Sequence, residues 1–139
     1  MLELKIAETQ YIPQILTFHK ELNNYYLSIG EKYLVSNKTN KDITRKINNY
    51  CLALCDGEVV GVVCATTKNN VVTLSQFFVK PEYRQLGVGT KLFNFALGQA
   101  KKEWSKIRTT YCKNGNTRAI DMYSRWGFRS GAQIMYLDF

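Results

Sequence analysis

Hydrophobic positions recur along the chain with two different periods, and the changes of period mark the expected elements. Apolar and polar residues alternate near the N-terminus, and the period returns to two beyond residue 50, which predicts β-strands. From residue 12 to 29 apolar residues recur every three or four positions, as on the buried face of an amphipathic helix. The expected strands are residues 2–7, 51–55, 59–67, 71–79, 106–111 and 133–139. The expected helices are residues 12–29, 40–49, 88–104 and 116–126.

Turn residues join three of these strands into an antiparallel meander. Asp56-Gly57 lies between two apolar runs, which is the pattern of a tight β-hairpin. Asn69-Asn70 turns the second of these runs into a third. These three strands are therefore neighbours in one sheet.

Capping residues place the ends of the helices. Thr9 is the expected N-cap of the first helix, with Pro13 in its first turn, where a missing N–H costs little. Gly30 is expected to end that helix, and Gly127 is expected to end the helix at residues 116–126.

The order of elements predicts an α/β (α+β) fold with a mixed, mostly antiparallel sheet flanked by helices. The sheet is expected to be parallel where helices 88–104 and 116–126 cross over. No Pro-, Ser- or Gly-rich linker, low-complexity run or internal repeat interrupts the chain. At 139 residues the chain has an ordinary domain size, so residues 1–139 are expected to form a single domain with a real core.

The charge balance changes which partners are expected. The 19 Lys and Arg residues outnumber the 11 Asp and Glu residues, which gives a net charge of +8. This balance favours polyanionic partners: nucleic acid, an acidic membrane surface or a phosphate-rich ligand. The longest apolar runs are far shorter than the about 20 residues that span a bilayer, and the N-terminus does not resemble a signal peptide. We therefore expect a cytoplasmic protein with no membrane partner.

Cysteine and histidine spacing gives no reason to expect a metal. The chain has four cysteines, which form no C-x-x-C pair, and one histidine, His19. Cys51 and Cys55 are expected to be small buried hydrophobic residues of a strand. Cys112 follows a strand, and nothing near it in the sequence indicates a depressed pKa, so no nucleophilic cysteine is expected.

The segment after residue 79 carries the clearest chemistry. It runs from a strand through Val79-x-Pro81-x-x-Arg84-x-x-Gly87-x-Gly89 into a helix. Exposed N–H groups and the helix dipole make such a turn an anion site, and glycine lets the backbone approach a phosphate. The pattern is neither G-x-x-x-x-G-K-[ST] nor G-x-G-x-x-G. It resembles the acyl-CoA pyrophosphate loop of the GNAT superfamily of CoA-dependent N-acetyltransferases.

A second motif strengthens this resemblance. Asn116-x-x-Ala119-x-x-x-Tyr123-x-x-x-Gly127-Phe128 is similar to the downstream helix of the same family. The two motifs occur in the family's order and at its usual separation. The resemblance implies an N-acetyltransferase that moves an acetyl group from acetyl-CoA to a primary amine of a small molecule or protein, by direct attack in a ternary complex.

Carried over by position, the resemblance implies a cofactor site made mainly of backbone groups. Backbone groups of Phe77, Phe78 and Val79 would bind the pantetheine arm like an added strand, where the neighbouring strand splays away. The side-chain amide of Asn116 would contact the CoA arm, and the Tyr123 hydroxyl would lie near the thioester sulfur. The pyrophosphate would be held by the backbone amides of Arg84, Gln85, Leu86, Gly87, Val88, Gly89 and Thr90.

The role implied for Tyr123 is also reasonable as chemistry. When an amine attacks a thioester, a thiolate leaves, and a thiol of pKa about 8.5 gains a proton readily from a phenol of pKa about 10. Tyr123 could instead be a packing residue on the buried stripe of its helix. Asn116 could cap that helix as well as bind the cofactor.

The general base is left open by the resemblance. Many family members place a glutamate on the strand before the loop, where this chain has Ser75 and Gln76. An ammonium of pKa about 10.4 must lose a proton before it attacks. Glu31 is the first candidate to accept it, followed by Glu21 and His19. A water chain or an amine that is already neutral would make a dedicated base unnecessary.

Two other classes of function stay open. The missing glutamate is also compatible with a catalytically silent acyl-CoA-binding module. The net charge is compatible with a nucleic-acid-binding domain, because basic clusters occupy residues 41–46 and 101–108, but no helix-turn-helix, zinc-finger or RNP signature accompanies them. The sequence does not identify the amine acceptor or the oligomeric state, although a homodimer is common for such domains.

Overall fold

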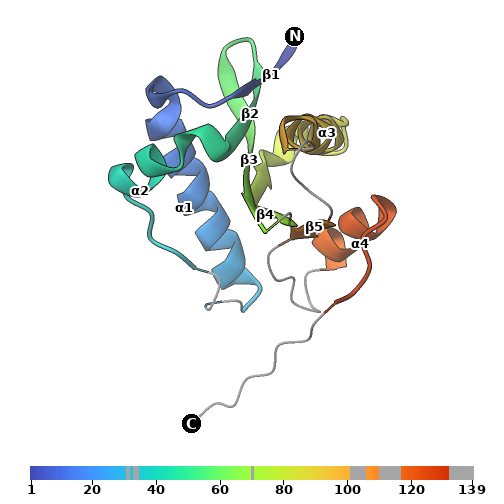
Figure 1. Ribbon diagram of the computed structural model, residues 1–139. Coiled ribbons are helices and arrows are strands. Elements are labelled where there is room, and N and C mark those ends of the chain that lie inside the picture. Colours follow the sequence, from blue (N-terminus) through green and yellow to red (C-terminus); the bar gives the residue numbers. More distant parts are fainter. Residues whose placement is uncertain (31, 33–34, 70, 101–105, 110–116, 132–139) are drawn as a thin grey trace.

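The chain forms a five-stranded sheet with helices on both faces (Figure 1). The structure is a computed structural model that describes residues 1–30, 32, 35–69, 71–100, 106–109 and 117–131. The strands are β1 Leu2–Ile6, β2 Tyr50–Cys55, β3 Glu58–Lys68, β4 Val71–Val79 and β5 Lys106–Thr109. The helices are α1 Ile12–Ser28, α2 Asn40–Arg45, α3 Val88–Ala100 and α4 Thr117–Arg125, and short 3₁₀ turns occupy Thr9–Tyr11, Ile47–Asn49 and Pro81–Tyr83.

The sheet is mixed and mostly antiparallel, as the sequence predicted. Strands β1 to β4 pair antiparallel in chain order, and β5 pairs parallel with β4. Helix α3 makes the crossover between these two parallel strands. The predicted closing strand at residues 133–139 lies outside the described residues.

A bulge interrupts the pairing of β3 with β4. Val62 pairs with Phe78 and Cys64 pairs with Ser75, so Val63 alone faces two residues of β4, Gln76 and Phe77. Gln76 takes a positive φ of 55°, a left-handed conformation that is uncommon for a residue with a side chain. The extra residue changes which face of the sheet the following side chains occupy.

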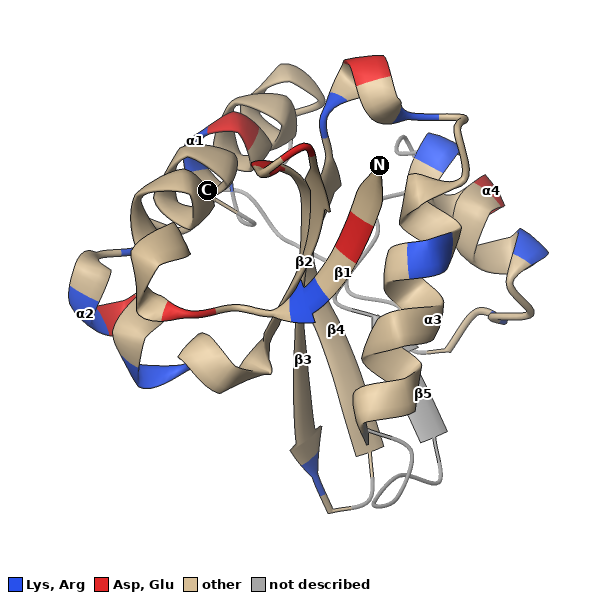
Figure 2. Cartoon of the chain, turned by 90° about the horizontal axis from the view of Figure 1, so that it is seen from above, with Lys and Arg blue, Asp and Glu red and all other residues tan. Residues whose placement is uncertain are grey.

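Each face of the sheet has its own hydrophobic core. Figure 2 shows α1 and α3 on opposite sides of the sheet. Ile15, Phe18 and Leu22 of α1 pack on one face, and Leu92 and Ala96 of α3 pack on the other. Because both faces are covered, β2 and β3 are nearly continuous apolar runs and bury consecutive residues.

The ends of the first helix differ in part from the prediction. Thr9 is not the N-cap: residues Thr9–Tyr11 form a 3₁₀ turn, and Tyr11 precedes α1 without a side-chain capping bond. The chain is extended at Glu8, and the Tyr11 N–H bonds back to the Glu8 carbonyl, which closes this turn before the helix begins. Pro13 lies in the first turn of α1, and Gly30 follows its end with a φ of 78°, as predicted.

The basic helix predicted at residues 40–49 divides into α2 and a 3₁₀ turn at Ile47–Asn49. The start of α2 is fixed by a capping box that the sequence pattern did not predict. The Thr39 hydroxyl accepts from the Asp42 N–H at 3.2 Å, and the Thr39 N–H donates to the Asp42 carboxylate at 3.0 Å. This box holds the segment before α2 in a defined position.

Replacing Leu92 by alanine is expected to destabilise the fold strongly. Leu92 is 0% exposed, and its Cδ2 atom lies only 3.3 Å from the position a Cβ would take at Gly61 of β3, so α3 packs closely on the sheet. A buried Leu→Ala change typically costs about 2–5 kcal/mol. Urea unfolding measures this loss. Leu27→Ala is the matched control, because Leu27 is 56% exposed; equal losses in the two variants would contradict the packing described.

Candidate functional site

The loop between β4 and α3 is held by an arginine that bonds back to the strand. Arg84 Nε donates to the Val79 carbonyl at 2.7 Å, and the guanidinium carbon lies 5.1 Å from the centre of the Phe78 ring. The turn at Pro81–Tyr83 is closed by the Tyr83 N–H bonding to the Lys80 carbonyl. These contacts fix the direction in which the chain enters α3.

Glycine at residue 87 is required by backbone conformation, while the glycine at residue 89 is not required by the protein's own packing. Gly87 has a φ of 82°, and its carbonyl accepts the Lys91 N–H at 3.0 Å as the first bond of α3. A Cβ at Gly87 would meet no atom within 4 Å, and a Cβ at Gly89 would meet only Val79 at 3.9 Å. The surface over this turn is therefore open, and a phosphate could approach its backbone closely.

The first N–H groups of α3 point out of the helix without intrahelical partners. Among the described residues, no protein acceptor is found for the N–H groups of residues 85–90. Together with the positive end of the helix dipole, these donors favour an anion. The donor set and the open glycine surface fit a pyrophosphate group.

Two arginines add positive charge beside this turn. Burial lowers the pKa of Arg84, and the neighbouring charge of Arg118 in α4 lowers it further. An anion bound between them would relieve this repulsion. Lys80 contributes less to the site, because it forms an ion pair with Glu58.

Tyr123 lies in an aromatic cluster that joins α4 to β4 and α3. Its ring centre is 6.4 Å from that of Phe77 and 5.3 Å from that of Phe128. Trp126 stacks on Phe93 of α3 at 4.3 Å, and on Phe77 of β4 at 5.7 Å. Such pairs stabilise beyond the area they bury, so they fix where the tyrosine lies relative to β4.

The end of α4 explains the spacing of Tyr123, Gly127 and Phe128. The Phe128 N–H bonds to the Tyr123 carbonyl at 3.0 Å, and the Gly127 N–H bonds to the Ser124 carbonyl at 3.0 Å. Gly127 has a φ of 93°, so these are the bonds of a Schellman motif with glycine at its left-handed position. The motif confirms Gly127 as the helix end and places Phe128 against Tyr123.

The edge of β4 beyond Leu74 is the expected position of the pantetheine arm. The described pairing with β5 covers Val71 to Leu74 of β4 and ends at Thr109. Phe77 lies past this point, beside Tyr123. Phe78 is 8% exposed and Val79 is 9% exposed, and the Val79 carbonyl already accepts from Arg84. A strand-like ligand would therefore share the Val79 carbonyl with Arg84.

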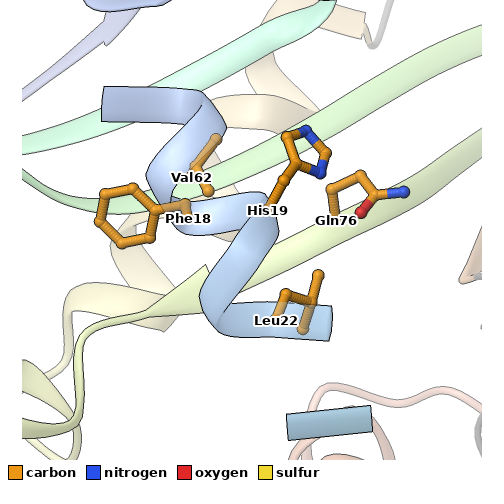
Figure 3. A pocket seen from close by; sticks show the side chains of 5 residues that line it. All are labelled: Phe18, His19, Leu22, Val62 and Gln76. Carbon is orange, nitrogen blue, oxygen red and sulfur yellow. The ribbon is translucent and has the colours of Figure 1, made fainter. Parts of the chain in front are cut away.

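A small crevice lies on the other face of β4, against α1 (Figure 3). Phe18, His19 and Leu22 of α1, Val62 of β3 and Gln76 of β4 line it. Its empty volume is about 140 Å³, and it is too narrow for a water molecule in this conformation. Val72 and Leu74 lie on the α3 face of β4, and the bulge shifts this alternation, so Gln76 lines the crevice on the α1 face while Phe77 lies on the α3 face.

His19 is the buried polar residue of this crevice. It is 5% exposed, and its Nε2 lies 2.9 Å from the Tyr50 hydroxyl. Burial and the charge of Lys38 lower the pKa of His19 to about 4, against a smaller opposing effect of a hydrogen bond with Gln76. The imidazole is therefore neutral at neutral pH and a weak proton acceptor.

The other candidate groups are placed as follows. Glu21 acts electrostatically on Lys80 and Arg84, on the side of the cofactor loop. Burial raises the pKa of Cys51 to about 12 and also raises that of Cys64, so both thiols are unreactive. Three predicted positions, Asn116, Glu31 and Cys112, lie outside the described residues.

Neither a membrane-spanning helix nor a cluster of metal ligands is found among the described residues. None of the described helices has both the length and the apolar character needed to cross a bilayer. Within the same part of the chain, no three side chains of His, Cys, Asp or Glu gather closely enough to hold a metal ion.

Comparison with known proteins assigns the family. Residues 15–128 match the acetyltransferase (GNAT) family. An uncharacterized N-acetyltransferase of Methanocaldococcus jannaschii is 38% identical over 61 residues, which are 44% of this chain and 27% of that protein. Another, from Archaeoglobus fulgidus, is 28% identical over 120 residues, 81% of this chain and 73% of the relative. The matched segment thus spans about a quarter of the first relative's length.

Solved structures share the fold. The PaiA N-acetyltransferase of Thermoplasma acidophilum, solved in complex with coenzyme A, superposes with a TM-score of 0.83 at 17% identity, covering 96% of this chain and 93% of that one. A GNAT-family acetyltransferase of Staphylococcus aureus gives a TM-score of 0.76 at 20% identity, covering 93% and 85%. The chain belongs to the GNAT family of acetyltransferases.

The stability of the protein is expected to fall on acidification because of His19. Above its ordinary pKa of 6.5 the imidazole is neutral in the folded and unfolded states alike. As the pH falls from 6.5 towards about 4, the unfolded chain takes up a proton that the folded protein excludes. This one group contributes a slope of at most about 1.4 kcal/mol per pH unit.

Urea unfolding of the wild type and of His19→Gln across this pH range measures the effect. The wild type should lose stability more steeply than the variant, whatever the variant's stability at pH 7. Parallel pH profiles would show that His19 is not held neutral by the fold.

Proposed function

We propose that this chain transfers the acetyl group of acetyl-CoA to a primary amine of a small molecule or protein. The observation that carries the proposal is the open glycine turn at the start of α3, where Gly87 has a positive φ. Tyr123 is held against Phe77 of β4, the strand that leads into this turn. Coenzyme A is present in the similar structure from Thermoplasma acidophilum. We further propose that residues 1–139 form a single acetyltransferase domain.

In this proposal the backbone supplies most of the cofactor contacts. The pantetheine arm lies along Phe77, Phe78 and Val79, beyond the described pairing of β4 with β5. The CoA arm also contacts the side-chain amide of Asn116. The pyrophosphate is held by the N–H groups of Gln85, Leu86, Gly87, Val88, Gly89 and Thr90; the N–H of Arg84, which the sequence also offered, already bonds to the Pro81 carbonyl at 3.2 Å.

The chemistry needs one proton donor from the chain. The amine nitrogen attacks the thioester carbonyl within a ternary complex, the carbon–sulfur bond breaks, and the thiolate takes the proton of the Tyr123 hydroxyl. The proton lost by the amine goes to solvent, and the phenol is reprotonated from solvent. Among the described residues, no carboxylate lines the crevice beside Gln76, and we propose that the amine reacts as the free base.

Gly87→Glu is expected to abolish CoA binding. The substitution adds a side chain at a φ of 82° and a negative charge where the pyrophosphate belongs. Calorimetric titration with acetyl-CoA measures the affinity. Gly98→Glu is the matched control, because a Cβ at Gly98 also meets nothing within 4 Å and adds the same charge elsewhere on α3. Unchanged affinity in Gly87→Glu would refute the loop assignment.

Tyr123→Phe is expected to lower turnover by about a hundredfold, as the loss of a general acid commonly does. CoA affinity should change little, because the ring and its aromatic contacts are kept. Thiol release with a panel of amines measures turnover, and Tyr11→Phe, on the 3₁₀ turn before α1, is the control.

Full activity of Tyr123→Phe at all pH values would contradict the acid role. Tight CoA binding by the wild type without turnover on any amine would instead identify a catalytically silent acyl-CoA-binding module. The amide of Gln76, in place of a carboxylate, is the feature that makes this second function worth testing.

A further inference from the structure

The acceptor side of β4 is separate from the cofactor loop. The bulge brings Phe77 to Tyr123 and Gln76 to the crevice against α1. An amine that reaches Gln76 is therefore on the opposite face of β4 from the tyrosine. The crevice is too narrow for water, so it forms the floor of an acceptor site and not the whole of it.

The floor offers no negative charge to an ammonium. Its polar side chains are the amide of Gln76 and the neutral imidazole of His19, and the rest are apolar. Several carboxylates of the described residues are committed elsewhere: Glu8 to Lys5, Asp42 to Thr39 and Arg45, Asp56 to the N-terminus, and Glu58 to Lys80. A site built for a polycation would carry carboxylates here.

Lys38 is a basic residue near this floor, and hydrogen bonds fix the backbone on both sides of it. The Asn23 side chain holds the Ser36 backbone with two hydrogen bonds, of 2.8 Å to its carbonyl and 3.1 Å from its N–H. Asn23 lies about one turn of α1 beyond His19. Lys38 is thus held between Ser36 and the capping box at Thr39. Figure 2 shows further basic positions in and next to α2.

Lys38 is the cation whose charge acts on the floor, because it lowers the pKa of His19, which lines the crevice. The hydrogen bonds of Asn23 to Ser36 and the capping box at Thr39 hold the backbone on both sides of it. Within the part of the chain that the structure describes, Lys38 forms no ion pair. Its charge is available to a ligand and repels a second ammonium group.

We infer that the acceptor is a small amine that carries an anionic group, a carboxylate or a phosphate, which Lys38 binds while the amine lies at Gln76. The inference rests on the proposed function and adds the class of acceptor. It also gives a role to part of the positive charge that the cofactor loop does not use.

Matched pairs of amines test the inference by thiol release from acetyl-CoA. β-Alanine is compared with β-alaninamide for the carboxylate, O-phosphoethanolamine with ethanolamine for the phosphate, and putrescine and spermidine represent polycations. The anionic member of at least one pair should have a kcat/KM at least about tenfold higher than its neutral partner and than the polyamines. The pair that shows the preference identifies the anionic group.

Charge reversal then assigns the preference to Lys38. Lys38→Glu should lower kcat/KM for the preferred anionic amine by about tenfold, mainly through KM, and leave acetyl-CoA affinity unchanged. Lys68→Glu, at the far end of β3, makes the same charge change and should keep the wild-type preference.

The possible failures are distinguishable. Preference for the polyamines or the neutral amines would overturn the inference and leave the proposed function standing, because an amine would still be acetylated. An anionic preference that survives Lys38→Glu would overturn the assignment to Lys38. No turnover on any amine, with acetyl-CoA bound, would overturn the proposed function and the inference together.

Discussion

The bulge in β4 is the constraint on which the rest of the site depends. Val72 and Leu74 pack on the face of β4 that α3 covers, and in a regular strand Gln76 would lie on that face too. Because Val63 faces both Gln76 and Phe77, the alternation shifts by one residue, so Phe77 lies on the α3 face and Gln76 on the α1 face. In our proposal the cofactor and the acceptor thereby use opposite faces of a strand that lies between β3 and β5. The left-handed conformation of Gln76 is tolerated because the pairing on both sides of it holds the strand in place.

The two sides of β4 are built differently. On the cofactor side, we propose that backbone N–H groups bind the ligand. Side chains such as Arg84 and the aromatic cluster around Trp126 hold these groups in position. On the acceptor side, a neutral floor lies near Lys38, whose backbone neighbours are held in place through Asn23 and Thr39. A family fold can therefore keep one cofactor site and change its acceptor by changing few residues of the helices.

Local sequence predicted the features that depend on local interactions. The meander, the glycine ends of α1 and α4, and the glycine turn before α3 all follow from residues close together in the chain. The bulge could not be predicted in this way, because it is a property of the pairing between two strands. The burial of His19 against Tyr50 and the stacking of Trp126 on Phe93 likewise arise from contacts between elements far apart in the sequence.

A crystal structure of the protein with bound acetyl-CoA tests the central claim most directly. We expect the pyrophosphate on the N–H groups of residues 85–90, the pantetheine arm along Phe77 to Val79, and the thioester sulfur within hydrogen-bond reach of the Tyr123 hydroxyl. The acetyl group should be directed towards the face that carries Gln76. A cofactor bound elsewhere, on the basic surface of α2 for example, or a thioester away from Tyr123, would contradict it.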